Sequence, residues 1–174
     1  MNWKTCKRCP LCEGRRKVVY GEGSLPCDVL FIGQAPGVTE DATGRPFIGP
    51  SGKLLRAGIN QALNGVGGSY RMYITNVVGC YPPEDRQPVK AEILECRERV
   101  EEIFDAAKPR ALVLLGTVAK LNCRYLGKRA KVKVVELLHP AYILQHGGED
   151  STEFLHFWRV LKEEAFNENE DGES

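Results

Sequence analysis

The sequence predicts a single α/β domain in which helices cover both faces of a four-stranded parallel sheet. Short apolar runs that stop at glycine or at a polar residue alternate with longer segments of helical spacing, an order typical of parallel sheets. The chain has 174 residues, an ordinary size for one domain with its own core. No internal repeat or low-complexity linker divides it, so we expect one folded unit.

The predicted strands are short and rich in apolar residues. The first, DVLFIG, is apolar from its second residue until it stops at glycine, as a strand buried on both faces does. The four strands are expected at residues 28–33, 72–78, 111–115 and 132–138.

Four helices are predicted from apolar residues that recur at helical spacing. They are expected at residues 53–63, 88–107, 117–125 and 154–166. The second begins at Pro88, and proline is favoured in the first helical turn. Residues 39–52 (TEDATGRPFIGPSG) form a glycine-rich loop that is too long for a plain connection, and such loops usually carry function.

Composition excludes several classes of protein. Apolar content of 43% and charged content of 27% are globular values, so the chain is not disordered as a whole. The polar start MNWKTCKRCP predicts no signal peptide, and no apolar run is long enough to span a membrane. We therefore expect a cytoplasmic protein with no membrane partner.

Charge is distributed unevenly along the chain. The formal net charge is +1, but residues 163–174 contain six acidic side chains and no basic ones. Residues 1–162 are therefore basic enough to bind a polyanion such as nucleic acid. We expect a folded domain at residues 1–162 and a mobile acidic tail at residues 163–174.

The cysteines indicate a metal centre. Cys6 and Cys9 form a CKRC pair, Cys80 follows a predicted strand, and Cys96 lies in a predicted helix. In a reducing compartment, a CxxC pair with two distant cysteines suits four thiolates that bind one centre. Spacing alone does not distinguish zinc from an iron–sulfur cluster, and zinc is favoured at this point because zinc sites built from four cysteines are common. The three remaining cysteines are expected to be buried or unused thiols: Cys12, Cys27 and Cys123.

Three segments lie at the carboxyl ends of predicted strands: residues 33–37 (GQAPG), Asn76 with the residues after it, and residues 139–140 (His-Pro). Ligands of parallel sheets bind outside the carboxyl ends of the strands, so these segments predict one site. The glycine turn is neither GxGxxG nor a Walker loop, which argues against dinucleotide or ATP binding. Taken singly, Asn76 could cap a turn and His139 could be a core histidine. Their shared position favours function.

These motifs together resemble those of the iron–sulfur (family four) uracil-DNA glycosylases over residues 6–145. The resemblance rests on CKRCPLCEGR with GEG, GQAPG, ED with GRPFIG, SGKLL, ITNVVGCYPPEDRQP, the lone Cys96 and HPAYIL, in that order. It implies the three-layer fold of that family and a [4Fe–4S] cluster on Cys6, Cys9, Cys80 and Cys96. Zinc becomes the less favoured occupant.

The resemblance also implies how a flipped uracil is held. Phe47 would stack on the base, Asn76 would read its edge, and His139 would donate a hydrogen bond to O2. The backbone at Gln34 and Ala35 would add base contacts. A further residue, Glu40, would crowd C5 against the thymine methyl group.

The DNA around the flipped nucleotide is expected to meet four side chains. Tyr142 and Ile143 would probe the duplex where the nucleotide has left. Ser51 and Arg86 complete the expected DNA contacts, although Arg86 could equally be a solvated charge.

The implied activity is hydrolysis of the uracil–deoxyribose bond in single- or double-stranded DNA during base excision repair, by a monomer. No lysine lies in a motif suited to Schiff-base chemistry, so no lyase step is expected. Two features depart from the family: Gln34 replaces its usual glutamate, and the stretch between Gly116 and His139 is short. Glutamine cannot act as a general base, so Glu40 or Asp41 could take that role, or leaving-group stabilisation could dominate.

Gln34 motivates an alternative hypothesis, a glycosylase-like protein that binds uracil-containing or damaged DNA, or a protein partner, without cleavage. A relative that links covalently to DNA ranks lower, because the extended histidine-bearing loop expected there is not evident.

Overall fold

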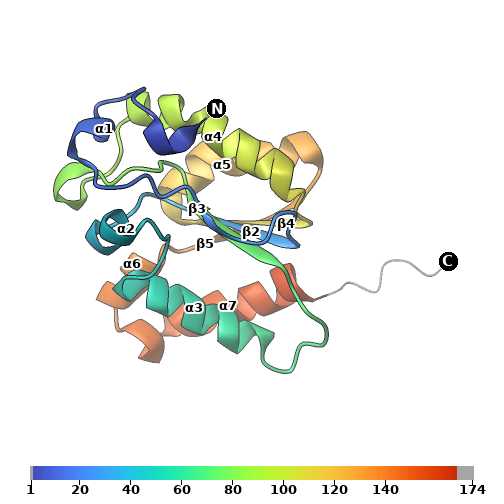
Figure 1. Ribbon diagram of the computed structural model, residues 1–174. Coiled ribbons are helices and arrows are strands. Elements are labelled where there is room, and N and C mark those ends of the chain that lie inside the picture. The colour runs from blue at the N-terminus through green and yellow to red at the C-terminus, as the bar shows by residue number, and fades with distance from the viewer. Residues whose placement is uncertain (1, 168–174) are drawn as a thin grey trace.

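The computed structural model describes residues 2–167 as a three-layer sandwich with the sheet in the middle (Figure 1). The sheet has five strands in the order β1-β3-β2-β4-β5. The strands are β1 (Glu22–Gly23), β2 (Val29–Gly33), β3 (Met72–Asn76), β4 (Ala111–Leu115) and β5 (Lys133–Leu137). The four predicted parallel strands are confirmed. The edge strand β1 is antiparallel to β3 and was not predicted, because two residues are too few to show a period.

The helices lie on both faces of the sheet (Figure 1). The α-helices are α1 (Leu11–Gly14), α2 (Val38–Thr43), α3 (Pro50–Leu63), α4 (Lys90–Ala107), α5 (Gly116–Ala130), α6 (Pro140–Gln145) and α7 (Thr152–Val160). Shorter helical turns are η1 (Trp3–Thr5), η2 (Pro83–Asp85), η3 (Gly148–Asp150) and the π-helical η4 (Leu161–Phe166).

Strand β2 separates two hydrophobic cores. Phe31 faces the core formed with α3, α7 and η4. Leu30 and Ile32 face the core formed with α4 and α5. All three side chains are fully buried, which explains why this strand is apolar without alternation.

All four predicted helices have different ends in the structure. Helix α4 begins at Lys90, after Pro88, and the Glu92 carboxylate accepts a hydrogen bond of 2.8 Å from the Val89 backbone N–H at this end. Helix α5 continues to Ala130, five residues beyond its predicted end. The predicted loop at residues 39–52 contains most of α2 and the start of α3.

The predicted boundary at residue 162 is wrong. Residues 161–166 form η4, and Ala165 and Phe166 are buried in the core. The Phe166 ring lies 6.5 Å from that of Phe31 and meets Tyr70 edge-on at 5.1 Å. The domain therefore continues to Phe166. The last part of the predicted tail, residues 168–174, lies outside the described residues.

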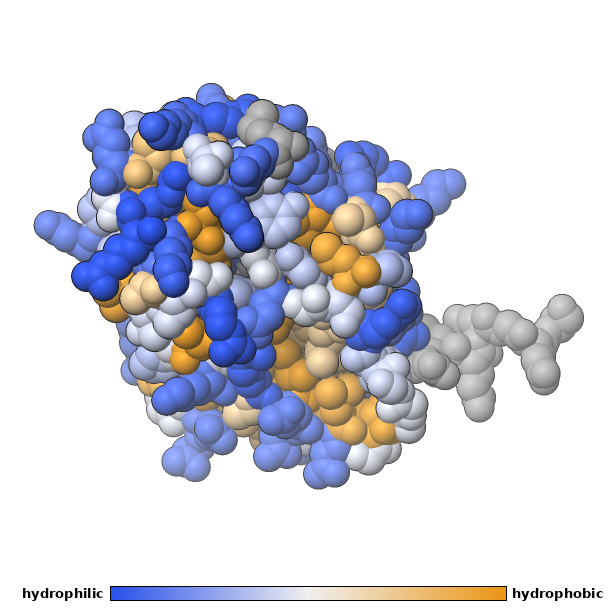
Figure 2. Space-filling model, viewed as in Figure 1, coloured by the Kyte–Doolittle hydropathy of each residue, from blue (hydrophilic) through white to orange (hydrophobic). Residues whose placement is uncertain are grey.

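The N-terminal segment packs along α4. The Trp3 indole N–H donates to Glu102 at 2.5 Å, and Arg8 pairs with both Glu95 and Glu98. The surface in Figure 2 is mainly hydrophilic, with apolar residues in separate patches. Within residues 2–167, no helix combines the length and the apolar character needed to cross a bilayer.

Candidate base-binding cleft and cysteine cluster

A cleft of about 420 Å³ lies at the carboxyl ends of the parallel strands. Its walls come from the segments after β2, β3 and β5, with the first turns of α2, α3 and α6. It brings together eight of the predicted site residues: Gln34, Ala35, Glu40, Phe47, Ser51, Asn76, Arg86 and His139. Tyr142 and Ile143 do not line it.

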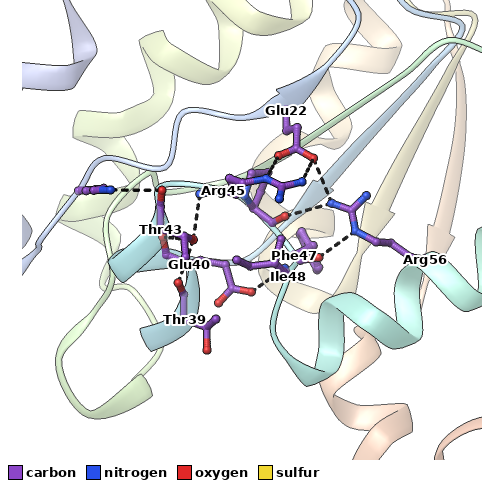
Figure 3. Close-up of polar contacts among 10 residues, drawn as sticks. Glu22, Thr39, Glu40, Thr43, Arg45, Phe47, Ile48 and Arg56 are labelled. Carbon is purple, nitrogen blue, oxygen red and sulfur yellow. Dashed lines mark hydrogen bonds and ion pairs between the residues drawn. The ribbon is translucent and has the colours of Figure 1, made fainter.

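Phe47 is held against the end of β2 by a strained backbone. Its φ of 50° lies in the left-handed region, which bulky residues rarely adopt. A Cβ on Gly33 would lie 2.3 Å from the Phe47 ring, and one on Gly52 would lie 2.0 Å from the Phe47 carbonyl carbon. Arg56 donates from Nε to the Phe47 carbonyl at 3.2 Å (Figure 3). Glycines on both sides and an arginine therefore fix this ring in the cleft.

Asn76 presents an unpaired oxygen at the end of β3. Its side chain is 2% exposed, and Oδ1 is buried with no hydrogen-bond partner among the described residues. A Cβ on Gly33 would lie 2.6 Å from this oxygen. An unsatisfied buried acceptor costs about 1–3 kcal/mol, so a ligand N–H that reached Oδ1 would be bound favourably.

His139 presents an unpaired donor. It caps α6, and its Nδ1 accepts the Ala141 backbone N–H at 3.1 Å. The proton of the neutral ring is therefore on Nε2, which is buried without a partner among residues 2–167. Burial lowers the pKa of His139 to about 4, so the imidazole is neutral near pH 7. Gly116 makes room for it, because a Cβ there would lie 2.9 Å from that of His139.

The Glu40 carboxylate is occupied by backbone groups. Oε1 accepts from Ile48 N at 2.9 Å and from Gly49 N at 2.7 Å, and Oε2 accepts from Gly37 N at 3.2 Å. Figure 3 shows the carboxylate directed at the loop that carries Phe47. Glu40 therefore ties the GQAPG turn to this loop. This corrects the expectation that the Glu40 carboxylate faces the base.

Asp41 does not line the cleft. It is 3% exposed, and its carboxylate accepts from the backbone N–H groups of Arg16 at 2.9 Å and Lys17 at 3.4 Å. It therefore anchors the N-terminal segment to α2, and the idea that Asp41 replaces a general base does not fit its position.

One expected DNA contact also needs correction. Ile143 is fully buried in the core, because this position of α6 faces the sheet, so its side chain cannot reach DNA. Its neighbours Tyr142 and Leu144 are 46% and 42% exposed. Arg86 lines the cleft, but both of its terminal nitrogens pair with Glu92, at 2.9 and 2.7 Å. That ion pair explains how an exposed arginine is held there.

Sequence reasoning missed Asp85 and Gln145, which also line the cleft. Asp85 belongs to η2 and has a left-handed φ of 55°. Asp85 could have been predicted from its position in the segment that follows β3, at the same edge of the sheet as Asn76. Gln145 ends α6, a helix that was not predicted.

The four predicted cysteine ligands share one neighbourhood. Cys80 and Cys96 are buried, and Cys6 and Cys9 are half-buried free thiols. Burial is the main cause that raises the pKa of Cys9, and the charges of Cys96 and Cys6 add to it. Burial also raises the pKa of Cys80 to about 11, against the effect of Arg15, and Cys96 and Cys9 contribute.

Arg15 links two of these cysteines. It donates from Nη1 to Cys80 Sγ at 3.4 Å and from Nη2 to the Cys6 carbonyl at 2.5 Å. The donor set, four cysteine thiols, fits an iron–sulfur cluster in its chemistry. Across residues 2–167, however, no three His, Cys, Asp or Glu side chains are arranged to hold a metal ion.

Fold and cleft define an α/β protein whose cleft is suited to a flat heterocycle carrying both a carbonyl group and an N–H group. The aromatic ring of Phe47, the acceptor of Asn76 and the donor of His139 are complementary to such a ligand. Nucleobases belong to this class of ligand.

Comparison with known proteins narrows this class. The family model described as "Uracil DNA glycosylase superfamily" matches residues 20–162. A type-4 uracil-DNA glycosylase of Thermotoga maritima is 35% identical over 82% of this chain and 80% of its own length. The enzymes of the same name from Pyrobaculum aerophilum and Saccharolobus solfataricus are 38% and 37% identical over 74% and 75% of this chain. These matches span only 64% and 58% of those two relatives.

The chain therefore belongs to the uracil DNA glycosylase superfamily and, within it, to the type-4 uracil-DNA glycosylases.

Proposed function

We propose that this protein hydrolyses the bond between uracil and deoxyribose in DNA and leaves an abasic site, as a step of base excision repair. One observation carries the proposal: a buried acceptor on Asn76 and a buried donor on His139 are both unpartnered in the same cleft. The names of the relatives, type-4 uracil-DNA glycosylases, support it.

Recognition begins with a nucleotide turned out of the DNA. Extrusion costs a few kcal/mol, and stacking on the Phe47 ring would recover about 1–3 kcal/mol. Asn76 Oδ1 would accept the N3–H of uracil, and its amide nitrogen would donate to O4. Cytosine has no N3–H and carries an amino group at C4, so the same amide would discriminate against it.

His139 would stabilise the leaving base. Cleavage places negative charge on the departing uracil, and Nε2–H would donate to its O2. A donor aimed at charge that grows in the transition state is worth about 3–4 kcal/mol. Because the ring is neutral, it would donate this hydrogen bond without supplying a full proton.

Stabilisation of the leaving group carries most of this mechanism. Gln34 cannot act as a general base, and the Glu40 carboxylate is engaged by three backbone N–H groups. The protein would therefore stabilise the developing cation on the sugar and activate the attacking water less strongly than it stabilises the departing base.

The activity is tested with a fluorescent oligonucleotide that carries one uracil, treated with alkali after incubation with the protein. We expect strand cleavage with uracil and none with thymine at the same position, in single- or double-stranded DNA. His139→Ala should lower the rate about a hundredfold or more, whereas the matched control His156→Ala, at an exposed histidine, should not. If the wild-type protein, loaded with its iron–sulfur cluster, cleaves no uracil-containing DNA, the proposed activity is refuted.

Gln34 and the occupied Glu40 carboxylate also favour a second candidate function, binding of uracil-containing DNA without cleavage. Selective binding of uracil DNA with no base release, together with activity restored by Gln34→Glu, would support it. Uracil release by the wild type would exclude it.

We further propose that Cys6, Cys9, Cys80 and Cys96 hold a [4Fe–4S] cluster. The cluster would cross-link the N-terminal segment to α4 and to the segment after β3, and would serve structure rather than the reaction. An absorbance band near ~400 nm, with iron and sulfide in the purified protein, is expected. Cys80→Ser should abolish the band and Cys27→Ser should retain it, whereas a colourless protein that contains zinc would contradict the proposal.

The remaining expectations complete this proposal. The protein would act in the cytoplasm as a monomer on single- or double-stranded DNA. Ser51, Tyr142 and Arg86 would lie near the DNA backbone. The folded domain would extend to Phe166, and not only to residue 162.

A further inference from the structure

Arg99 is a buried cation that the proposed mechanism does not use. It lies on α4, three residues after Cys96, and is 1% exposed. Burial of a guanidinium group is costly unless its hydrogen bonds are satisfied. Its recorded acceptors are all neutral oxygens, three from backbone carbonyls and one from a hydroxyl. A group retained at such a cost specifies the geometry of what it binds.

The acceptors surround the end of β3, where Asn76 begins the cleft. Nη2 donates to the carbonyl of Asn76 and, at 3.4 Å, to that of Val77. Nη1 donates to the Thr75 hydroxyl at 3.1 Å and to the Tyr20 carbonyl at 2.8 Å. The Thr75 hydroxyl itself donates to the Tyr20 carbonyl at 2.7 Å. One guanidinium group thus holds the last two residues of β3, the residue after them and the segment before β1.

The surroundings of Arg99 are shaped to admit it. Its guanidinium carbon lies 5.9 Å from the Tyr20 ring, which favours a cation. A Cβ on Gly79 would lie 3.1 Å from Arg99 Nε, so glycine leaves room for the guanidinium group. The Asn76 backbone is therefore held by hydrogen bonds on the side of α4, while its side-chain amide faces the cleft.

We propose that Arg99 is a positioning residue that sets the orientation of the Asn76 amide and thereby the selectivity for uracil. This inference rests on the proposed function of the cleft. The rotation of the Asn76 carbonyl determines the direction in which the side chain leaves the strand. A loosened carbonyl would tilt Oδ1 away from the position of the uracil N3–H. Arg99 touches neither base nor sugar, so it acts only through Asn76.

The test is a double-mutant cycle with single-turnover uracil release as the readout. Arg99→Met keeps the length of the side chain and removes its donors. It should lower the rate about a hundredfold in the wild-type background and by less than about twofold in the Asn76→Ala background. Arg99→Lys should show a smaller loss, because an ammonium group can bind only some of these carbonyls. The matched control is Arg97→Met, which removes an exposed arginine from the same helix.

A merely structural role would give a different result. Equal losses in both Asn76 backgrounds, or no loss in either, would overturn the inference. Binding of uracil DNA relative to thymine DNA is measured in parallel. This ratio should fall in Arg99→Met and Arg99→Lys and stay unchanged in Arg97→Met. An unchanged ratio would also overturn the inference.

The binding ratio decides the inference even if the wild type releases no uracil, so failure of the proposed activity and failure of this inference remain distinguishable. If Arg99→Met does not fold, the same cycle is carried through with Arg99→Lys.

Discussion

At the scale of single residues, the hydrogen bond at Nδ1 of His139 determines the chemistry of the cleft. It leaves the proton on Nε2, and burial lowers the pKa of the ring to about 4. The neutral form is therefore the one that we propose to act on the departing base. We expect no inflection from this group in the rate of uracil release between pH 6 and 8, and a loss only as the pH approaches 4.

The same lowered pKa predicts a stability effect. Unfolded histidine has a pKa near 6.5, so between pH 6.5 and 4 the unfolded chain binds a proton that the folded chain does not. Stability contributed by neutral His139 is thus present above pH 6.5 and is lost on acidification, by at most about 1.4 kcal/mol per pH unit. Urea unfolding at pH 7 and pH 5 should show a smaller loss for His139→Gln than for the wild type. Equal losses would contradict the assignment.

Glu40 illustrates a role that a sequence cannot distinguish. A carboxylate that faces a base and one that binds backbone N–H groups look alike in the motif GVTED. In the structure Glu40 accepts from Gly37, Ile48 and Gly49. Asn76 and His139 were easier to predict, because each lies at the carboxyl end of an apolar strand, at the same edge of the sheet.

We expect Glu40→Ala to lower the free energy of unfolding by about 2–4 kcal/mol, because it leaves three backbone donors unpaired. Glu40→Gln should cost less, since its oxygen can still accept from Ile48 and Gly49. Glu149→Ala removes an exposed carboxylate and should change stability by less than about 0.5 kcal/mol. Urea unfolding measures all three. A Glu40→Ala protein of unchanged stability but without activity would instead place this carboxylate in the reaction.

At the scale of elements, periodicity predicted the long helices and the buried strands. It missed α2 and α6 because each has six residues, fewer than two turns, so no apolar period can develop. The misplacement of Ile143 follows from this: read as a loop, HPAYIL leaves every residue exposed. As a helix it turns Ile143 inward and leaves Tyr142 and Leu144 outside.

The π-helical η4 is part of the core. Phe166 is fully buried against Phe31 and Tyr70, and the Tyr70 hydroxyl donates to its carbonyl. Phe166→Ala should lower the free energy of unfolding by about 3–5 kcal/mol. Leu155→Ala, at a partly exposed position of α7, should cost less than about 1 kcal/mol. Thermal unfolding of the two variants measures this difference. Similar losses of stability in both would place Phe166 outside the core.

At the scale of the whole molecule, the fold class, the meeting of the cleft segments at the carboxyl ends of parallel strands and the thiol neighbourhood could all be anticipated. Arg99 could not. An arginine on a predicted helix reads as a solvated charge, and only tertiary packing shows that it lies under the end of β3. Ion pairs between distant segments, such as Arg8 with Glu98, depend on the same long-range arrangement.

The charge distribution predicts a moderate dependence of DNA binding on salt. Arginines near the cleft, Arg45 and Arg86, are already paired with Glu22 and Glu92. Few counterions would therefore be released, so the plot of log affinity against log salt should have a slope of roughly −2 to −4. Uracil DNA and thymine DNA should give the same slope, because phosphate contacts do not read the base. Inhibition by free uracil, which is neutral, should not change with salt. If this inhibition weakened as steeply as DNA binding does, the charged groups would act on the base and not on the backbone.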